Sequence, residues 1–182
     1  LQPGWLRPSW FFVMEDTMAW TNAKQMSDKP RKAQDLYETP YSMTRDLLER
    51  ESFPGPVLEP AKGGGAIVRV LENWGQEVVA YDLETNFLLE AGEYPSIITN
   101  PPYTYANEFI YKCKKVATKK FALLLPLQYL NGKKRYATVF TDTEFPLGRV
   151  YVYTTQAMLG EPLREDGTYG RGMMIYAWYV WV

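Results

Sequence analysis

The order of its predicted elements makes this chain an α/β protein with a mostly parallel sheet and helices on both faces. Short apolar runs typical of strands alternate along the sequence with segments whose apolar residues recur at helical spacing. The run at 121–125 is continuously apolar, as expected of a parallel strand that is covered on both faces. Only a loop separates the last two predicted strands, so we expect them to form an antiparallel pair at one sheet edge.

The chain divides into an arm and a domain. Residues 1–35 carry scattered prolines and tryptophans, and we expect them to form a loosely attached arm. Because the chain begins at Leu1 and several methionines follow, this arm can also be an upstream extension that precedes the natural start. Residues 36–182 have the length of one domain, since domains typically hold roughly 100–200 residues.

The first half of the domain is expected to alternate helices and strands. In order, its elements are a helix around 43–48, a strand at 57–58, a helix at 67–74 and a strand at 77–81. Thr39-Pro40 predicts an extended turn into the first helix, because the residue before a proline avoids the helical region. The Phe-Pro-Gly-Pro sequence at 53–56 ends that helix, and Gly75 closes the next one.

The second half continues the alternation. Its expected elements are a strand at 96–99, helices at 105–116 and 133–140, and strands at 121–125, 149–154 and 173–182. Two consecutive prolines, Pro101 and Pro102, stop the strand at 96–99. The segment 159–171 is rich in glycine and charge, which predicts a loop.

The composition excludes several classes of chemistry. The chain has no histidine, which removes the commonest general base and metal ligand and every Ser-His-Asp or Cys-His scheme. Its one cysteine, Cys113, allows neither an internal disulfide nor a zinc cluster. We therefore expect chemistry on carboxylates, amides, hydroxyls, aromatic rings and backbone groups, with no metal. No stretch is apolar and long enough to cross a membrane, so the expected location is the cytoplasm.

Positive charge is clustered although the net charge is only -1. One group comprises Lys112, Lys114, Lys115, Lys119 and Lys120, and a second comprises Lys133, Lys134 and Arg135. Such groups are commonly solvated helix faces, and they can also contact the phosphates of a nucleic acid.

A glycine-rich turn follows the strand at 57–58. It reads Glu59-Pro60-Ala61-Lys62-Gly63-Gly64-Gly65, and such a turn between a buried strand and a helix lets the backbone approach a ligand closely. Asp82 ends the next strand, where an acid commonly binds ribose hydroxyls. The pair predicts an adenosine-containing cofactor, and the alternative is a tight turn with a surface aspartate. The turn lacks the ending of a phosphate-binding loop and the third glycine of a dinucleotide fingerprint.

Asn100-Pro101-Pro102-Tyr103 is the most specific signal in the chain. Two prolines remove two backbone donors and hold the chain extended, which leaves the Pro101 carbonyl able to face a ligand. Asn100 adds a side-chain oxygen acceptor, and Tyr103 adds a flat ring. Two acceptors and a ring suit a planar amine whose two N–H groups must be held. The alternative is a turn that merely ends a strand.

These motifs resemble those of amino-methyltransferases, above all DNA adenine-N6 methyltransferases that use S-adenosylmethionine. Asn100 to Tyr103 is similar to their catalytic motif, and Glu59 to Gly65 is similar to their cofactor-binding motif. Thr39-Pro40 resembles an upstream element that helps to bind the methionine end of the cofactor. The tail is similar to small phage-type members, so the resemblance covers residues 36–182 and implies a bacterial or phage-infected host.

The resemblance implies a Rossmann-like, mostly parallel sheet of seven strands and a set of cofactor contacts. The residues implied to bind the cofactor are Thr39, Pro40, Glu59, Pro60, Gly63, Gly65, Asp82, Asn86 and Phe87. Gly63 and Gly65 would pass the methionine portion, and Asp82 would hold the ribose. Many members have an aspartate before Phe or Leu where this chain has Asn86-Phe87, and the amide oxygen can still accept from the cofactor's adenine amine.

The resemblance also implies a mechanism. A target adenine leaves the duplex, Tyr103 stacks on it, and Asn100 and the Pro101 carbonyl accept its two N6 protons. Pro102 completes the motif, and methyl transfer is a direct in-line displacement that depends on positioning and electrostatics.

No target-recognition region is evident. The gap between Asp82 and Asn100 is too short to hold one, and the sequence ends directly after the last predicted strand. We therefore expect this chain alone to bind DNA weakly and with little sequence preference. The alternatives are RNA adenine methylation, protein glutamine methylation and a non-catalytic protein that has kept the cofactor fold. Thr39-Pro40 and the tail favour a nucleic acid.

Overall fold

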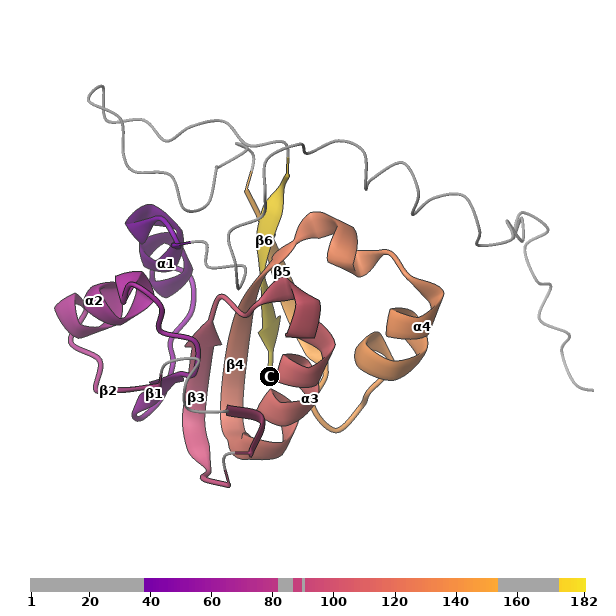
Figure 1. Ribbon diagram of the computed structural model, residues 1–182, viewed down its shortest axis with the longest axis horizontal. Coiled ribbons are helices and arrows are strands. Elements are labelled where there is room, and N and C mark those ends of the chain that lie inside the picture. The colour runs from indigo at the N-terminus through magenta and orange to yellow at the C-terminus, as the bar shows by residue number, and fades with distance from the viewer. Residues whose placement is uncertain (1–37, 82–86, 90, 154–173) are drawn as a thin grey trace, which may run out of the picture. The chain divides into compact units, whose positions relative to one another are not determined.

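The computed structural model describes residues 38–81, 87–89, 91–153 and 174–182 (Figure 1). This part of the chain contains one sheet of six strands in the order β2-β1-β3-β4-β6-β5. The strands are β1 (Val57–Glu59), β2 (Val78–Ala80), β3 (Tyr94–Thr99), β4 (Ala117–Pro126), β5 (Leu147–Val152) and β6 (Tyr176–Trp181). The helices are α1 (Tyr41–Leu48), α2 (Ala66–Asn73), α3 (Ala106–Val116) and the short α4 (Lys133–Arg135).

The pairing of the strands confirms a mostly parallel sheet. Strands β2, β1, β3 and β4 pair in parallel, and β6 is antiparallel to both of its neighbours, β4 and β5. The expected antiparallel pair at one edge is therefore present, and its reversed member is β6 rather than the outermost strand. Because β5 runs in the direction of β4, the carboxyl ends of five strands lie at one edge of the sheet.

The expectation of seven strands is wrong for the part of the chain that the structure describes. The described residues form six strands, and Phe87–Leu89, between β2 and β3, form a single 3₁₀ turn.

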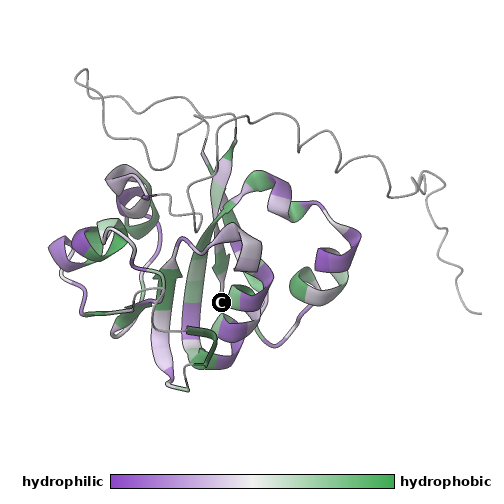
Figure 2. Ribbon diagram, viewed as in Figure 1, coloured by the Kyte–Doolittle hydropathy of each residue, from purple (hydrophilic) through white to green (hydrophobic). Residues whose placement is uncertain are grey.

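Helices cover both faces of the sheet, with α1 and α2 on one face and α3 on the other (Figure 1). Adjacent residues of a strand point to opposite faces, so Ile98 packs with α1 and α2 while Ile97 packs with α3. Every side chain of β6 is buried, including Trp178 and Trp181. Both hydrophilic and hydrophobic residues occur within the helices, as expected of helices that bury one face (Figure 2).

The predicted elements differ from the observed ones mainly at their ends. The strand expected at 149–154 is β5 at Leu147–Val152, and the helix expected at 133–140 is α4 followed by a π-helical turn at Tyr136–Phe140. The arm at 1–35 and the loop at 159–171 lie outside the described residues. No helix within the described ranges is long and apolar enough to span a membrane.

A buried carboxylate ties the turn after α1 to the sheet. Glu51 accepts hydrogen bonds from Lys120 of β4 at 2.7 Å and from Tyr151 of β5 at 2.7 Å, and it pairs with Arg149. Burial alone would raise the pKa of Glu51, but the hydrogen bonds from Arg149, Lys120 and Tyr151 outweigh it and lower the pKa to about 2. Glu51 therefore stays ionised and fixes the turn against two strands.

Candidate functional site

The two predicted motifs meet at the carboxyl ends of β1 and β3. Glu59 ends β1 and is 1% exposed, and Thr99 ends β3 directly before Asn100. The Thr99 hydroxyl donates to Glu59 Oε1 at 2.7 Å, and the backbone N–H of Ala61 donates to the same oxygen at 2.9 Å. One carboxylate thus joins the start of the glycine turn to the residue that precedes Asn100. Pro60, which follows Glu59, is also buried.

The glycine turn has a backbone that other residues adopt only with strain. Gly63 has a φ of 49° and Gly65 a φ of 80°, and Gly65 is the N-cap of α2. At Gly64 the constraint is space, because a Cβ there would lie 2.9 Å from Glu38 Oε1. The absence of a side chain at Gly64 therefore lets Glu38, before α1, approach the turn closely.

Arg69 connects three segments around this turn, and nothing in the sequence pattern singled it out for that role. Its guanidinium donates to the carbonyl of Gly64 at 2.7 Å, to the hydroxyl of Tyr41 at 2.8 Å and to Glu38 Oε1 at 3.0 Å. It also lies over the Tyr41 ring, 5.4 Å from the ring centroid. The first turn of α2 is therefore fastened to the residues that lead into α1.

Thr39 lies against the predicted catalytic motif. Asn100 Nδ2 donates to Thr39 Oγ1 at 3.1 Å, and the hydroxyl of Tyr103 donates to Asn100 Oδ1 at 3.0 Å. Thr39 is 4% exposed, and Pro40 after it is buried as the N-cap of α1. The carboxamide of Asn100 is thereby oriented, with its nitrogen toward Thr39 and its oxygen toward the Tyr103 ring.

The second proline of the motif adopts the extended backbone expected of it. Pro102 has φ -57° and ψ 118°, and the chain then turns at Tyr103–Tyr105. From the described residues no hydrogen bond reaches the Pro101 carbonyl. The ring of Tyr103 packs beside that of Tyr176 at a centroid distance of 5.9 Å and an angle of 30°. Tyr176 begins β6 and was not among the predicted site residues, because an aromatic strand is equally typical of a core.

The carboxyl group of Glu59 has an unusual environment. Burial raises its pKa to about 8, and the hydrogen bonds from Thr99 and Ala61 only partly oppose that rise. Its second oxygen, Oε2, is buried with no hydrogen-bond partner among the described residues. A buried polar atom without a partner next to a glycine turn can form a hydrogen bond with a polar group of a ligand.

Three predicted cofactor contacts follow β2, and the structure describes one of them. Asp82 and Asn86 lie outside the described residues. Phe87 is 3% exposed and packs on Phe109 of α3, with ring centroids 5.2 Å apart. Phe87 therefore belongs to the core that supports this edge.

The two predicted basic groups are only partly available for phosphate contacts. Lys114 pairs with Asp142, Lys120 pairs with Glu51, and Arg135 lies over the Tyr129 ring at 4.7 Å. The exposed members are Lys115, Lys119, Lys133 and Lys134. Lys115 and Lys119 stand where α3 leads into the amino end of β4, at the opposite edge of the sheet from Asn100. Lys133 and Lys134 follow the carboxyl end of β4, on the side of the candidate site.

Solved structures resemble this chain, whereas no protein-family model and no curated protein sequence matches it. A magnesium protoporphyrin IX methyltransferase from Synechocystis PCC 6803 with bound S-adenosylmethionine aligns with a TM-score of 0.53 at 15% identity, over 78% of this chain and 76% of that one. A proposed class I S-adenosylmethionine-dependent methyltransferase from Listeria monocytogenes aligns with a TM-score of 0.57 at 12% identity, over 87% of this chain and 64% of that one. The chain has the class I methyltransferase fold.

A proposed hemolysin from Lactococcus lactis shares the fold too, with a TM-score of 0.52 at 12% identity over 84% of this chain and 89% of that one. The class I methyltransferase fold is one that binds S-adenosylmethionine, as the Synechocystis structure illustrates. In such open sheets ligands lie outside the carboxyl ends of the strands, the edge at which Glu59, the glycine turn and Asn100 meet here.

Proposed function

We propose that this chain transfers a methyl group from S-adenosylmethionine to the N6 amine of adenine in DNA. The observation that carries the proposal is the oriented carboxamide of Asn100 beside the glycine turn. An amide oxygen, a proline carbonyl and a tyrosine ring in consecutive residues suit a flat base with an exocyclic amine. The class I methyltransferase fold supports methyl transfer, and the local chemistry supports an amine as the acceptor.

The residues at the edge of the sheet fit the cofactor. The positive-φ glycines Gly63 and Gly65 leave the turn without side chains, so a ligand can lie close to the backbone. Glu59 Oε2 is a buried polar atom for which the described residues supply no hydrogen-bond partner. When it is bound there, S-adenosylmethionine supplies an electrophilic methyl group on a cationic sulfur. The task of the chain is then to hold the acceptor nitrogen in line with that methyl group.

Asn100 and Pro101 would hold the two hydrogens of the target amine. Asn100 Oδ1 already accepts the Tyr103 hydroxyl, so this oxygen stands within hydrogen-bond reach of the ring on which a base would stack. The Pro101 carbonyl is the second acceptor. With both hydrogens accepted, the lone pair of the nitrogen leaves conjugation with the ring and points toward the methyl group. These hydrogen bonds strengthen as charge develops on nitrogen, and therefore they favour the transition state.

Thr39 would act on this step through Asn100. Its hydroxyl accepts from Asn100 Nδ2, which directs the amide oxygen rather than the amide nitrogen toward the target amine. A flipped amide would present donors to an amine that needs acceptors. Thr39 is therefore a positioning residue in this proposal, a role beyond the cofactor contact that the sequence resemblance implies.

Methyl transfer to a panel of acceptors tests the proposal. Purified chain is incubated with labelled S-adenosylmethionine and duplex DNA, single-stranded DNA, RNA or a release-factor-type protein. The proposal predicts label in DNA as N6-methyladenine. Label in RNA alone would assign the site to adenine in RNA, and label on protein glutamine would assign it to the glutamine side-chain amide. Cofactor binding without transfer to any acceptor would make the chain a non-catalytic member of the fold.

A further inference from the structure

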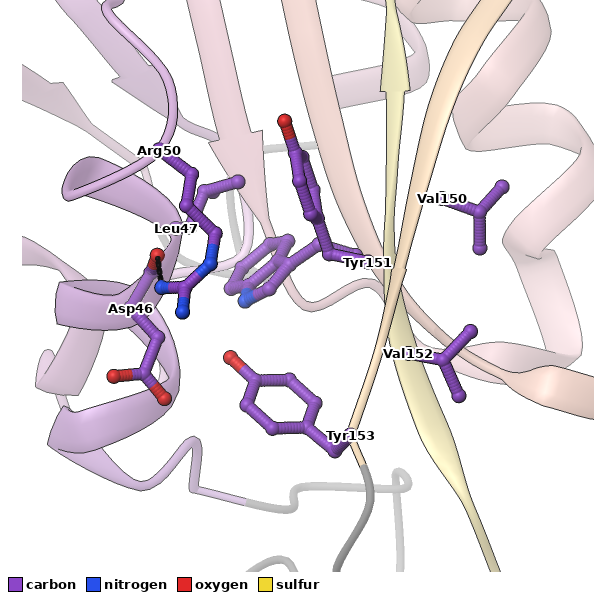
Figure 3. Close-up of a pocket in the computed structure, with 8 residues that line it drawn as sticks. Asp46, Leu47, Arg50, Val150, Tyr151, Val152 and Tyr153 are labelled. Carbon is purple, nitrogen blue, oxygen red and sulfur yellow. Dashed lines mark hydrogen bonds between the residues drawn. The ribbon is translucent and has the colours of Figure 1, made fainter.

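A cavity lies between α1 and β5, and its lining includes neither the glycine turn nor Asn100 (Figure 3). Its volume is about 460 Å³, within the range of about 300–1,000 Å³ that small-molecule sites occupy. Helix α1 contributes one wall, and β5 and β6 contribute the other. Its lining includes Asp46, Arg50, Tyr151, Tyr153 and Trp178.

The wall from β5 and β6 is aromatic, and its polar atoms are already bonded within the protein. The Tyr153 hydroxyl and the Trp178 indole N–H both donate to the Met43 carbonyl, at 2.8 Å and 2.9 Å. The Tyr151 hydroxyl donates to Glu51. These bonds fix the three rings. Trp178 is buried, whereas Tyr151 and Tyr153 are partly exposed, so what these two tyrosine rings offer to a ligand is a flat apolar surface rather than a hydrogen bond.

The wall from α1 and the turn after it carries one anion, Asp46, and one cation, Arg50. Arg50 Nη1 donates to the backbone carbonyl of Asp46 at 2.8 Å, and Figure 3 shows the guanidinium and the Asp46 carboxylate across the cavity from the tyrosines. Arg50 also lies near the carboxylate of Glu49, with an oxygen of Glu49 3.8 Å from the guanidinium. The guanidinium has five N–H donors, so it keeps donors for a ligand, and the Asp46 carboxylate is an acceptor.

We propose that this cavity binds a guanine base from the nucleic-acid strand that carries the target adenine. A purine is flat and stacks on aromatic rings, and guanine has acceptors at O6 and N7 and donors at N1 and N2. Arg50 matches the acceptors and Asp46 matches the donors. Adenine has a donor amine at position 6, where guanine has the acceptor O6. Pyrimidines have a single ring and therefore cover less of the aromatic wall. The strand part of this proposal rests on the proposed function, whereas binding of the base itself does not.

The cavity and the candidate site are joined by short structural links. Thr39 contacts Asn100, and Met43, whose carbonyl holds two rings of the cavity, lies four residues later in the first turn of α1. Across the sheet, the N–H of Tyr153 donates to the carbonyl of Tyr176, whose ring packs beside Tyr103. A single strand that crosses this edge can therefore place one base on Tyr103 and another in the cavity.

Nucleotide titrations test the base-binding part. Calorimetry with the whole chain and GMP, AMP, CMP or UMP should show tightest binding of GMP. Arg50→Ala and Asp46→Asn should each weaken GMP binding by about tenfold or more, the scale of one bidentate hydrogen-bonded pair. Arg45→Ala is the matched control, since Arg45 is an exposed arginine of the same helix outside the cavity. Equal binding of all four nucleotides, or an equal loss in Arg45→Ala, would overturn the assignment.

Methylation kinetics test the strand part. With single-stranded oligonucleotides that contain guanine near the target adenine, Arg50→Ala should raise KM for the oligonucleotide about tenfold and leave KM for S-adenosylmethionine unchanged. An unchanged oligonucleotide KM despite weaker GMP binding would limit the cavity to free nucleotides and overturn the strand part. If the wild-type chain binds GMP as described but methylates no adenine, the proposed function fails and the base-binding site stands.

Discussion

At the scale of single residues, the site depends on how one carboxamide is oriented. Asn100 can act as a pair of donors or as an acceptor, and its contacts with Thr39 and Tyr103 select the acceptor. The two residues Thr39 and Asn100 are 61 positions apart in the sequence, so no local pattern could predict their contact. The sequence predicted both residues as functional, Asn100 as a catalytic residue and Thr39 as a contact to the cofactor.

Replacing Thr39 by Val should lower kcat by about tenfold or more, because the amide of Asn100 loses the acceptor that orients it. The KM for S-adenosylmethionine should change little, and Thr39→Ser should retain activity because it keeps the hydroxyl. Steady-state kinetics of the three proteins, with melting temperatures to confirm folding, make the comparison. An equal loss of activity in the serine and valine variants would show that the Thr39 hydroxyl does not orient Asn100.

Glu59 should make stability depend on pH. Its folded pKa is raised from 4.5 to about 8, so its contribution is fully present below pH 4.5 and is lost as pH rises toward 8. Each pKa unit between the folded and unfolded values corresponds to roughly 1.4 kcal/mol. Denaturant unfolding from pH 5 to 9 should show the fall, and Glu59→Gln should flatten it. An identical slope in both proteins would mean that Glu59 is already ionised when the protein is folded.

At the scale of elements, two side-chain clusters hold the turns that flank α1. Arg69 fastens the residues before α1 to the glycine turn, and Glu51 fastens the residues after α1 to β4 and β5. Both clusters join segments far apart in the sequence. The sequence predicted the elements from their apolar periodicity, but it contains no comparable signal for these contacts between elements.

Arg69→Met should weaken S-adenosylmethionine binding by about fivefold to tenfold, because the Gly64 carbonyl and Glu38 lose their shared donor. The effect on folding stability should be small, since the guanidinium and Glu38 are about half exposed. Calorimetry with the cofactor measures the change. Glu72→Gln, at an exposed position of the same helix, serves as the control and should bind normally.

Glu51→Ala should lower the free energy of unfolding by about 3 kcal/mol, because Lys120 and Arg149 lose a buried carboxylate partner. Glu49→Ala, an exposed neighbour, should stay within about 0.5 kcal/mol. The folded pKa of Glu51 is lowered to about 2, so its stabilisation is present above pH 4.5 and lost as pH falls toward 2. Urea unfolding at pH 7 and pH 3 should show a smaller difference between wild type and Glu51→Ala at the lower pH.

At the scale of the whole molecule, the sequence predicted the sheet class better than the strand count. Short, mainly apolar segments at 57–58, 96–99 and 121–125 predicted strands, and these became β1, β3 and β4 in the interior of the sheet. The expectation of seven strands came from the family resemblance, and the described residues form six. The short α4 and its π-helical turn also departed from the expected helix, since local periodicity does not distinguish these forms.

The distribution of exposed charge leads to a prediction about DNA binding. Lys133 and Lys134 lie on the side of the candidate site, and Lys115 and Lys119 lie toward the opposite sheet edge. Changing Lys133 and Lys134 to Gln should lower the slope of log affinity against log salt by up to about two units, close to one for each phosphate that the lysines no longer neutralise. The Lys115 and Lys119 pair should have little effect. Equal effects of both pairs would indicate that DNA does not approach from the side of Asn100.

The product of methyl transfer to DNA tests the central claim most directly. Wild-type chain and Asn100→Ala are incubated with labelled S-adenosylmethionine and DNA, and the DNA is digested to nucleosides and separated. We predict labelled N6-methyl-2′-deoxyadenosine from the wild type, a loss of roughly a hundredfold or more in Asn100→Ala, and cofactor binding that is unchanged in the variant. Label on another nucleoside, or full activity in Asn100→Ala, would contradict the account.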